Sequence, residues 1–254
     1  MAVAQAAVRM RPAHGDDIAS MIEFGHSTHV GLRREHNEDT YYADAELGLW
    51  LVADGMGGHE HGEVASAIAR DAMVREVTAG APLAQAVQRA DEEIILHSSR
   101  KAEALPMGTT IAALRVQRDD YEVAWVGDSR VYLWQDGTLQ QLSQDHSYVQ
   151  ELVAQGAISA EQARNHPHRN MVTQALGITD PQELHVETRS GKLERGMQFL
   201  VCSDGLTEEV DDHAIATVLA RRELAAQECV EHLVLAALDS GGSDNITVLL
   251  VRVR

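Results

Sequence analysis

The sequence predicts an α+β fold, with β-sheets in the middle and pairs of helices outside. Short apolar runs typical of strands outnumber the segments with helical spacing. The helical segments come in pairs between groups of strands, and the pattern is not the regular alternation of strand and helix that marks a doubly wound parallel sheet. A chain of 254 residues is long enough to form one large domain with a sizeable core.

The first half of the chain contains the first strands and the first helix pair. Residues 1–20 are rich in alanine and have no clear hydrophobic period, so we expect a disordered tail followed by one domain at 21–254. Alternating residues or short apolar runs predict strands, and apolar residues at spacing four predict helices. The elements expected here are strands from Met21, from Tyr41 and at 49–53, helices at 63–77 and 83–94, and a strand at 107–116.

The second half contains a hairpin and the second helix pair. Asp136 and Gly137 form a favourable turn between two strands, and Gly241 and Gly242 end the last helix. The elements expected here are strands at 121–126, 130–134, 139–142, 183–188 and 197–202, helices at 211–220 and 226–238, and a final strand at 246–253.

The segment 144–170, which we call the flap, differs in character from the strands around it. Residues 147–155 have the pattern of a short helix that ends at Gly156. Ser159 and Gln162 have the spacing of a capping box at the start of a second helix. A helical excursion between strands is a candidate cover for a functional site.

Composition excludes several classes of protein. The formal net charge of -18 argues against binding to nucleic acid through its phosphates. No apolar run approaches the length of a membrane span, and the N-terminus lacks a signal-peptide core, so we expect a cytoplasmic protein that does not bind membranes. The two cysteines, Cys202 and Cys229, give no disulfide framework and are expected to be small core residues.

Four aspartates occupy similar places at the ends of predicted strands. Asp54, Asp128 and Asp204 each follow an apolar run, and Asp244 precedes the last one. Each alone is equally an ordinary turn or cap residue. Together they predict a shared site, where like carboxylates repel one another unless cations intervene. Oxygen ligands suit Mg²⁺ or Mn²⁺, whereas no cysteine pair or histidine spacing indicates zinc.

The charged segment 31–39 can complete such a site. Arg34 or Arg33 can offer a planar fork of donors to a phosphate. The alternative for Arg34 is a surface salt bridge with Glu38 or Asp39, and the alternative for these two acids is a solvated turn. Two adjacent metal ions can lower the pKa of a shared water and hold a phosphoryl oxygen.

These segments together resemble the metal-dependent protein phosphatase family (PPM, or type 2C), and within it the bacterial serine/threonine phosphatases. The matching pieces run in the family's order from about Ile22 to the end of the chain. They are Gly31-Leu32-Arg33-Arg34-Glu35-His36-Asn37-Glu38-Asp39, Asp54-Gly55-Met56-Gly57-Gly58-His59, Gly62-Glu63, Met107-Gly108-Thr109-Thr110, Gly127-Asp128-Ser129-Arg130, Ser203-Asp204-Gly205-Leu206 and Asp244-Asn245-Ile246-Thr247.

The resemblance implies a four-layer α-β-β-α sandwich, in which two antiparallel sheets are flanked by helix pairs, with the flap at 144–170. It also implies two Mn²⁺ or Mg²⁺ ions, with a third in bacterial members. The implied metal ligands are Asp54 as the bridge, the Gly55 carbonyl, Asp204, Asp244, Glu38 with Asp39, and Asp128 beside Asp204 for the third ion. Arg34 would contact the substrate phosphate, and Asn245 would orient Asp244.

The function implied by the resemblance is hydrolysis of phosphoserine and phosphothreonine in proteins by a metal-activated water. Such an enzyme would act as a monomer on phosphorylated proteins and oppose a Ser/Thr protein kinase. Met56 stands where eukaryotic members carry a histidine proposed as general acid, so that role has no assigned residue. Two alternatives stay open, a non-catalytic phosphoprotein-binding scaffold and a metal-dependent nuclease or phosphodiesterase, and the acidic balance disfavours the second.

Overall fold

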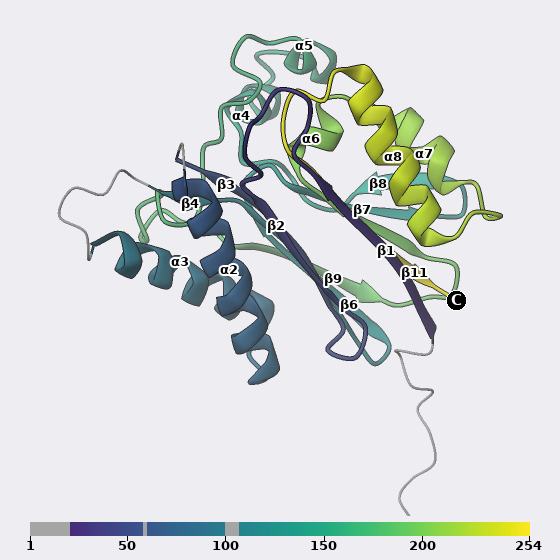
Figure 1. Ribbon diagram of the computed structural model, residues 1–254, viewed down its shortest axis with the longest axis horizontal. Coiled ribbons are helices and arrows are strands. Elements are labelled where there is room, and N and C mark those ends of the chain that lie inside the picture. The colour runs from purple at the N-terminus through teal and green to yellow at the C-terminus, as the bar shows by residue number, and fades with distance from the viewer. Residues whose placement is uncertain (1–20, 58–59, 100–106) are drawn as a thin grey trace, which may run out of the picture.

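The computed structural model describes residues 21–57, 60–99 and 107–254. Two antiparallel β-sheets face each other in the middle, and helices cover the outer face of each (Figure 1). This arrangement confirms the predicted α+β sandwich of four layers. The disordered tail expected at 1–20 lies outside the described residues. No helix among the described residues has the length and apolar character needed to cross a bilayer.

The two sheets share no strand. The first has the order β1 (Ile22–His29), β11 (Ile246–Val253), β10 (Gln198–Cys202), β7 (Arg130–Gln135) and β8 (Thr138–Gln141). The second has the order β2 (Asp39–Asp44), β3 (Leu49–Met56), β5 (Ile111–Gln117), β6 (Asp120–Val126) and β9 (Glu187–Lys192), and the short β4 (Gly108–Thr109) pairs with β3.

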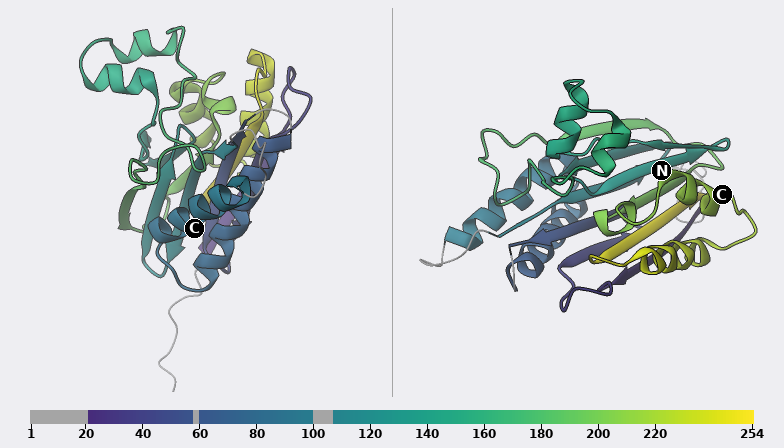
Figure 2. Two further views of the ribbon diagram at one scale, coloured as in Figure 1. Left: turned by 90° about the vertical axis from the view of Figure 1, so that its left-hand side faces the viewer. Right: turned by 90° about the horizontal axis from the view of Figure 1, so that it is seen from above.

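The helices form two outer layers and one excursion. Helices α2 (Glu60–Thr78) and α3 (Leu83–Ser99) cover the second sheet, and α7 (Asp212–Leu219) and α8 (Ala226–Ser240) lie on the first. The flap carries α4 (Tyr148–Ala154) and α5 (Ala160–Arg164), which lie at one end of the sandwich, apart from its four layers (Figure 2). A further short helix, α6 (Asp204–Thr207), directly follows β10.

The apolar strands have alternate residues in different core layers, as the period of two requires. In β3, Leu49, Leu51 and Ala53 pack against the α2–α3 side. Trp50 and Val52 of the same strand pack between the two sheets. Strand β11 divides its residues in the same way between the inter-sheet core and the α7–α8 side. Burial on both faces explains why these strands are apolar almost throughout.

One expectation about the elements was wrong, and one short helix was not predicted. The strand predicted at 183–188 is β9 at Glu187–Lys192 instead, because the amides of Glu183 and Leu184 donate to the Asp180 carbonyl and form a turn. Helix α6 was not predicted, because four residues are too few to show a helical period. The capping box at Ser159 and the turn at Asp136-Gly137, with positive φ at both residues, are confirmed.

Candidate active site

A cavity of about 510 Å³ lies at one end of the sandwich, where the segments bearing the four aspartates converge. Asp54, Asp128, Asp204 and Asp244 all line this cavity, although they are up to 190 positions apart in the sequence (244 − 54). The other predicted site residues that line it are Arg34, Glu38, Gly55 and Asn245. The strand-end pattern thus corresponds to one shared pocket.

Asp54 is held at the end of β3 by two threonines. The Thr110 hydroxyl accepts a hydrogen bond from the Asp54 amide (3.2 Å), and the Thr110 amide donates to the Asp54 carbonyl (2.9 Å). The Thr109 hydroxyl donates to the same carbonyl (2.8 Å). With both backbone groups paired, the Asp54 side chain is the part of the residue left to face the cavity.

Gly55 is a glycine because two backbones meet there. A Cβ atom at this position would lie 2.1 Å from the Gly62 carbonyl oxygen and 2.7 Å from that of Glu38. The Gly55 amide donates to the Glu38 carbonyl (3.2 Å), which joins the segment before β2 to the end of β3. Glu38 is thereby placed on the wall of the cavity beside Asp54.

Asp204 and Asp244 are brought together by a similar close approach. Asp204 begins α6, and a Cβ atom on the next residue, Gly205, would lie 2.0 Å from the Asn245 carbonyl oxygen. The Asn245 amide donates to Asp244 Oδ1 (2.8 Å). Arg34 Nη2 donates to Asp244 Oδ2 (2.5 Å), so the ion pair of Arg34 is formed with Asp244 and not with Glu38 or Asp39.

Asp39 lies behind the cavity wall. Its Oδ2 accepts hydrogen bonds from the hydroxyls of Ser203 (2.8 Å) and Thr247 (2.6 Å), whereas Oδ1 is buried and has no hydrogen-bond partner. Ser203 and Thr247 were not singled out by the sequence analysis. Their place in the motifs that contain Asp204 and Asp244 could have indicated that they lie near the site.

The side chain of Asn245 has a wider role than orienting Asp244. Its Oδ1 accepts from the Glu38 amide (2.8 Å), and its Nδ2 donates to the carbonyls of Val30 and His36 (both 2.9 Å). One amide therefore ties the loop that carries Arg34 and Glu38 to the strand that follows Asp244. The neighbouring Arg33 is exposed and does not line the cavity.

Burial and mutual repulsion raise the pKa values of the clustered acids. Burial is the larger cause for Asp54 and Asp128, whose pKa values lie well above the ordinary range, and the charges of neighbouring aspartates add to it. Burial raises the pKa of Asp39 to about 7, and it raises the pKa values of Asp204 and Glu38 as well. The site is therefore unfavourable for its own ionised carboxylates.

Divalent cations fit this set of residues. Asp204 Oδ1 and Asp39 Oδ1 are buried without a hydrogen-bond partner. The ligand atoms that the surrounding acids offer are oxygens of the kind that Mg²⁺ and Mn²⁺ bind. No group of three or more histidine, cysteine, aspartate and glutamate side chains within the described residues forms a ready-made metal-binding group. Cation binding would therefore require some adjustment of these side chains.

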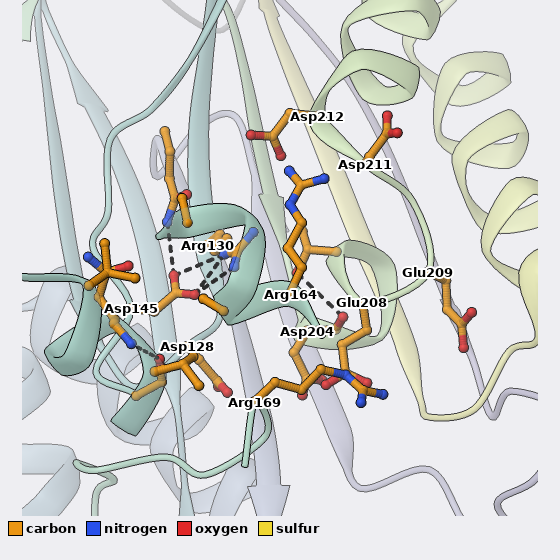
Figure 3. Close-up of a pocket in the computed structure, with 18 residues that line it drawn as sticks. Asp128, Arg130, Asp145, Arg164, Arg169, Asp204, Glu208, Glu209, Asp211 and Asp212 are labelled. Carbon is orange, nitrogen blue, oxygen red and sulfur yellow. Dashed lines mark hydrogen bonds and ion pairs between the residues drawn. The ribbon is translucent and has the colours of Figure 1, made fainter. Parts of the chain in front are cut away.

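A second cavity of about 400 Å³ adjoins the first and shares Asp128 and Asp204 with it. It lies between the flap and the segment from α6 to the start of α7 (Figure 3). Three arginines contribute to its lining, Arg130, Arg164 and Arg169, among more numerous acids. The flap thus walls a space directly beside the aspartate cluster.

Comparisons with known proteins show which sequences and structures this chain resembles. A sequence model of the family described as Protein phosphatase 2C matches residues 31–237. The serine/threonine phosphatase stp of Listeria monocytogenes is 37% identical over 238 residues, which cover 88% of this chain and 93% of that protein. The structure of the Mycobacterium tuberculosis serine/threonine phosphatase PstP/Ppp has a TM-score of 0.84 at 33% identity, and the match covers 92% of this chain and 99% of that chain. A structure of the PstP catalytic domain in complex with two manganese ions has a TM-score of 0.81 at 32% identity, over 91% of this chain and 97% of that chain.

Proposed function

The chain belongs to the protein phosphatase 2C family, and we propose that it hydrolyses phosphoserine and phosphothreonine in proteins with two or three Mn²⁺ or Mg²⁺ ions. One observation carries the proposal: four aspartates from distant segments and one arginine line a single cavity. A cluster of buried carboxylates with raised pKa values is costly without cations and suits a site that binds them.

The residues proposed to hold the ions are Asp54, the Gly55 carbonyl, Asp204, Asp244, Glu38, Asp39 and Asp128. Divalent cations at such a site would supply a water of lowered pKa as nucleophile and charge stabilisation for the phosphoryl oxygens. Support for this use of the cavity comes from the manganese complex of PstP, a relative of the same fold.

The chain's own groups bind and orient the substrate. Arg34 is just over half exposed at its side chain (55%) and lies at the edge of the cavity, where its guanidinium fork can meet a phosphate. Its present partner, Asp244, restrains the side chain on the cavity side. Asn245 fixes the loop that carries Arg34, so the arginine and Glu38 approach the cavity as a unit.

The proposal also covers the opposing enzyme, the cellular location and the oligomeric state. A phosphatase that acts on phosphoserine and phosphothreonine needs a kinase that makes these groups, so a Ser/Thr protein kinase is the proposed opposing enzyme. We also infer that the protein acts in the cytoplasm as a monomer. Light scattering on the purified protein tests the oligomeric state, and a dimer mass would contradict the monomer.

The test of the activity is turnover of a phosphothreonine peptide with Mn²⁺, repeated with EDTA. We expect release of phosphate with Mn²⁺ and none with EDTA. A scaffold would bind the peptide without releasing phosphate. A phosphodiesterase would instead hydrolyse bis-p-nitrophenyl phosphate faster than p-nitrophenyl phosphate. Either of these two results would replace the proposed function.

A further inference from the structure

Arg130 and Asp145 form a paired contact at the base of the flap (Figure 3). Arg130 Nε donates to Asp145 Oδ1 (2.9 Å), and Arg130 Nη2 donates to Asp145 Oδ2 (2.6 Å), which is a two-pronged geometry. The side chains are only 25% and 12% exposed. Arg130 starts β7, and Asp145 lies between β8 and α4, where the flap leaves the sheet.

The pair belongs to a longer chain of hydrogen bonds. Gln141 Nε2 donates to Asp145 Oδ1 (2.8 Å), and Arg130 Nη1 donates to the Tyr132 hydroxyl (2.9 Å). The Tyr132 hydroxyl in turn donates to Asp212 Oδ1 (3.2 Å) at the first residue of α7. This chain of contacts connects the flap base to α7 through β7, and both ends contribute to the lining of the 400 Å³ cavity.

A second contact holds the flap base beside Asp128. The His146 amide donates to the Gly127 carbonyl (2.9 Å), and the Gly127 amide donates to His146 Nδ1 (3.3 Å). The Thr173 amide, shortly after the flap in the chain, donates to the His146 carbonyl (2.8 Å). Outgoing and returning ends of the flap are thus both fixed to the turn that presents Asp128.

The body of the flap has little packing of its own. Helix α5 has no buried residue, and α4 has only Val149. A segment with so few buried apolar contacts opens at low free energy unless its base is held. The contacts at the flap base, at Gln144, Asp145 and His146, therefore hold the flap in position.

We propose that Arg130 and Asp145 are positioning residues that hold the flap where the 400 Å³ cavity can accept the residues next to the phosphorylated side chain of a protein substrate. The proposal rests on the proposed phosphatase function. The cavity adjoins the aspartate cluster and has the size of an ordinary ligand site. A small aryl phosphate has no flanking residues and needs only the aspartate cavity.

The test compares Asp145→Asn with Asp120→Asn. Asp120, the first residue of β6, forms an exposed ion pair with Lys192 (2.7 Å). The control therefore makes the same chemical change outside the flap. For Asp145→Asn we expect kcat/KM for a phosphothreonine peptide to fall roughly ten- to a hundredfold, mainly through KM, because small displacements of a binding wall are costly. Turnover of p-nitrophenyl phosphate should stay within about twofold of wild type. Asp120→Asn should leave both substrates unaffected.

Limited trypsin digestion gives a readout independent of activity. Arg164 and Arg169 are exposed on the flap, and cleavage there should be faster in Asp145→Asn and unchanged in Asp120→Asn. Equal losses on both phosphate substrates would overturn the proposal, because the pair would then support the chemistry itself. Faster cleavage with unchanged peptide kinetics would also overturn it, as would unchanged cleavage.

A milder variant covers the case in which Asp145→Asn does not fold. Tyr132→Phe keeps the packing of a fully buried ring and the Arg130–Asp145 pair, and it removes the hydroxyl that accepts from Arg130 Nη1 and donates to Asp212. We expect a smaller change in the same direction in peptide KM and in flap cleavage, and no change in either would overturn the proposal. If the wild-type protein hydrolyses neither substrate, the proposed function fails, while trypsin digestion still decides whether the pair holds the flap.

Discussion

Asp39 and Asp54 lie directly opposite each other in the antiparallel pairing of β2 and β3. Like charges in opposed positions of two strands destabilise a sheet. Asp54 faces the cavity, and Asp39 is buried behind it with one oxygen unpaired. The pairing therefore has a cost in the metal-free protein, and cation binding would offset that cost.

Replacing Asp54 by Asn should remove activity and stabilise the metal-free protein. Loss of the carboxylate removes the proposed bridging ligand, so we expect Mn²⁺-dependent phosphopeptide turnover to drop to the background seen with EDTA. The same change relieves repulsion with Asp39, Asp204 and Asp128, so the thermal midpoint in EDTA should rise. Asp120→Asn serves as the control and should change neither quantity. Full activity in Asp54→Asn would contradict the proposed role of this residue.

The stability of the metal-free protein should fall as the pH rises. Burial raises the pKa of Asp39 to about 7, above its value in an unfolded chain, so proton binding favours the folded state. This contribution is fully present below about pH 4 and is lost as the pH rises through about 7. Urea unfolding in EDTA at a series of pH values measures it.

Saturating Mn²⁺ should weaken or reverse this trend, because metal ligands bind in their deprotonated form. Asp39→Asn should flatten the pH dependence in EDTA, since an amide oxygen can still accept the Ser203 and Thr247 hydroxyls without ionising. A metal-free protein that becomes more stable between about pH 5.5 and 8 would show that repulsion among these acids is not the dominant effect.

The sequence predicted those parts of the fold and site that depend on residues close together in the chain. Residues 49–54, an apolar run that ends in an aspartate, predict both a buried strand and the acid at its end, and the structure has both. The partner of Arg34 could not be predicted, because Asp244 is 210 positions away and only the fold brings the two together. The contacts of Asn245 with Val30 and His36 were hidden for the same reason. The misplaced β9 shows a different difficulty, since an exposed edge strand carries almost no apolar signal.

Replacing Arg34 by Ala should mainly weaken substrate binding. A hydrogen bond to a charged group contributes about 1.5–3 kcal/mol, so we expect KM for a phosphopeptide to rise about tenfold or more, with a smaller effect on kcat. Arg33→Ala is the matched control, because Arg33 is exposed and forms no ion pair within the described part of the chain. Arg34→Lys should be intermediate, since it keeps the charge and loses the fork. Unchanged kinetics in Arg34→Ala would rule out phosphate contact.

Replacing Asn245 by Ala should lower metal affinity although its side chain is not a proposed ligand. The side-chain amide of Asn245 accepts from the Glu38 backbone and donates to the His36 carbonyl. Its loss frees the loop that carries both Glu38 and Arg34. Changes to groups that orient metal ligands typically reduce metal affinity by about 10- to 100-fold. Calorimetric titration with Mn²⁺ measures this loss. Asn37→Ala is the control, because Asn37 lies in the same loop but its side chain donates to Thr28 of β1 and contacts no proposed ligand except the backbone amide of Asp39. If both variants bind Mn²⁺ as wild type does, the loop is held by other contacts and Asn245 does not position the site.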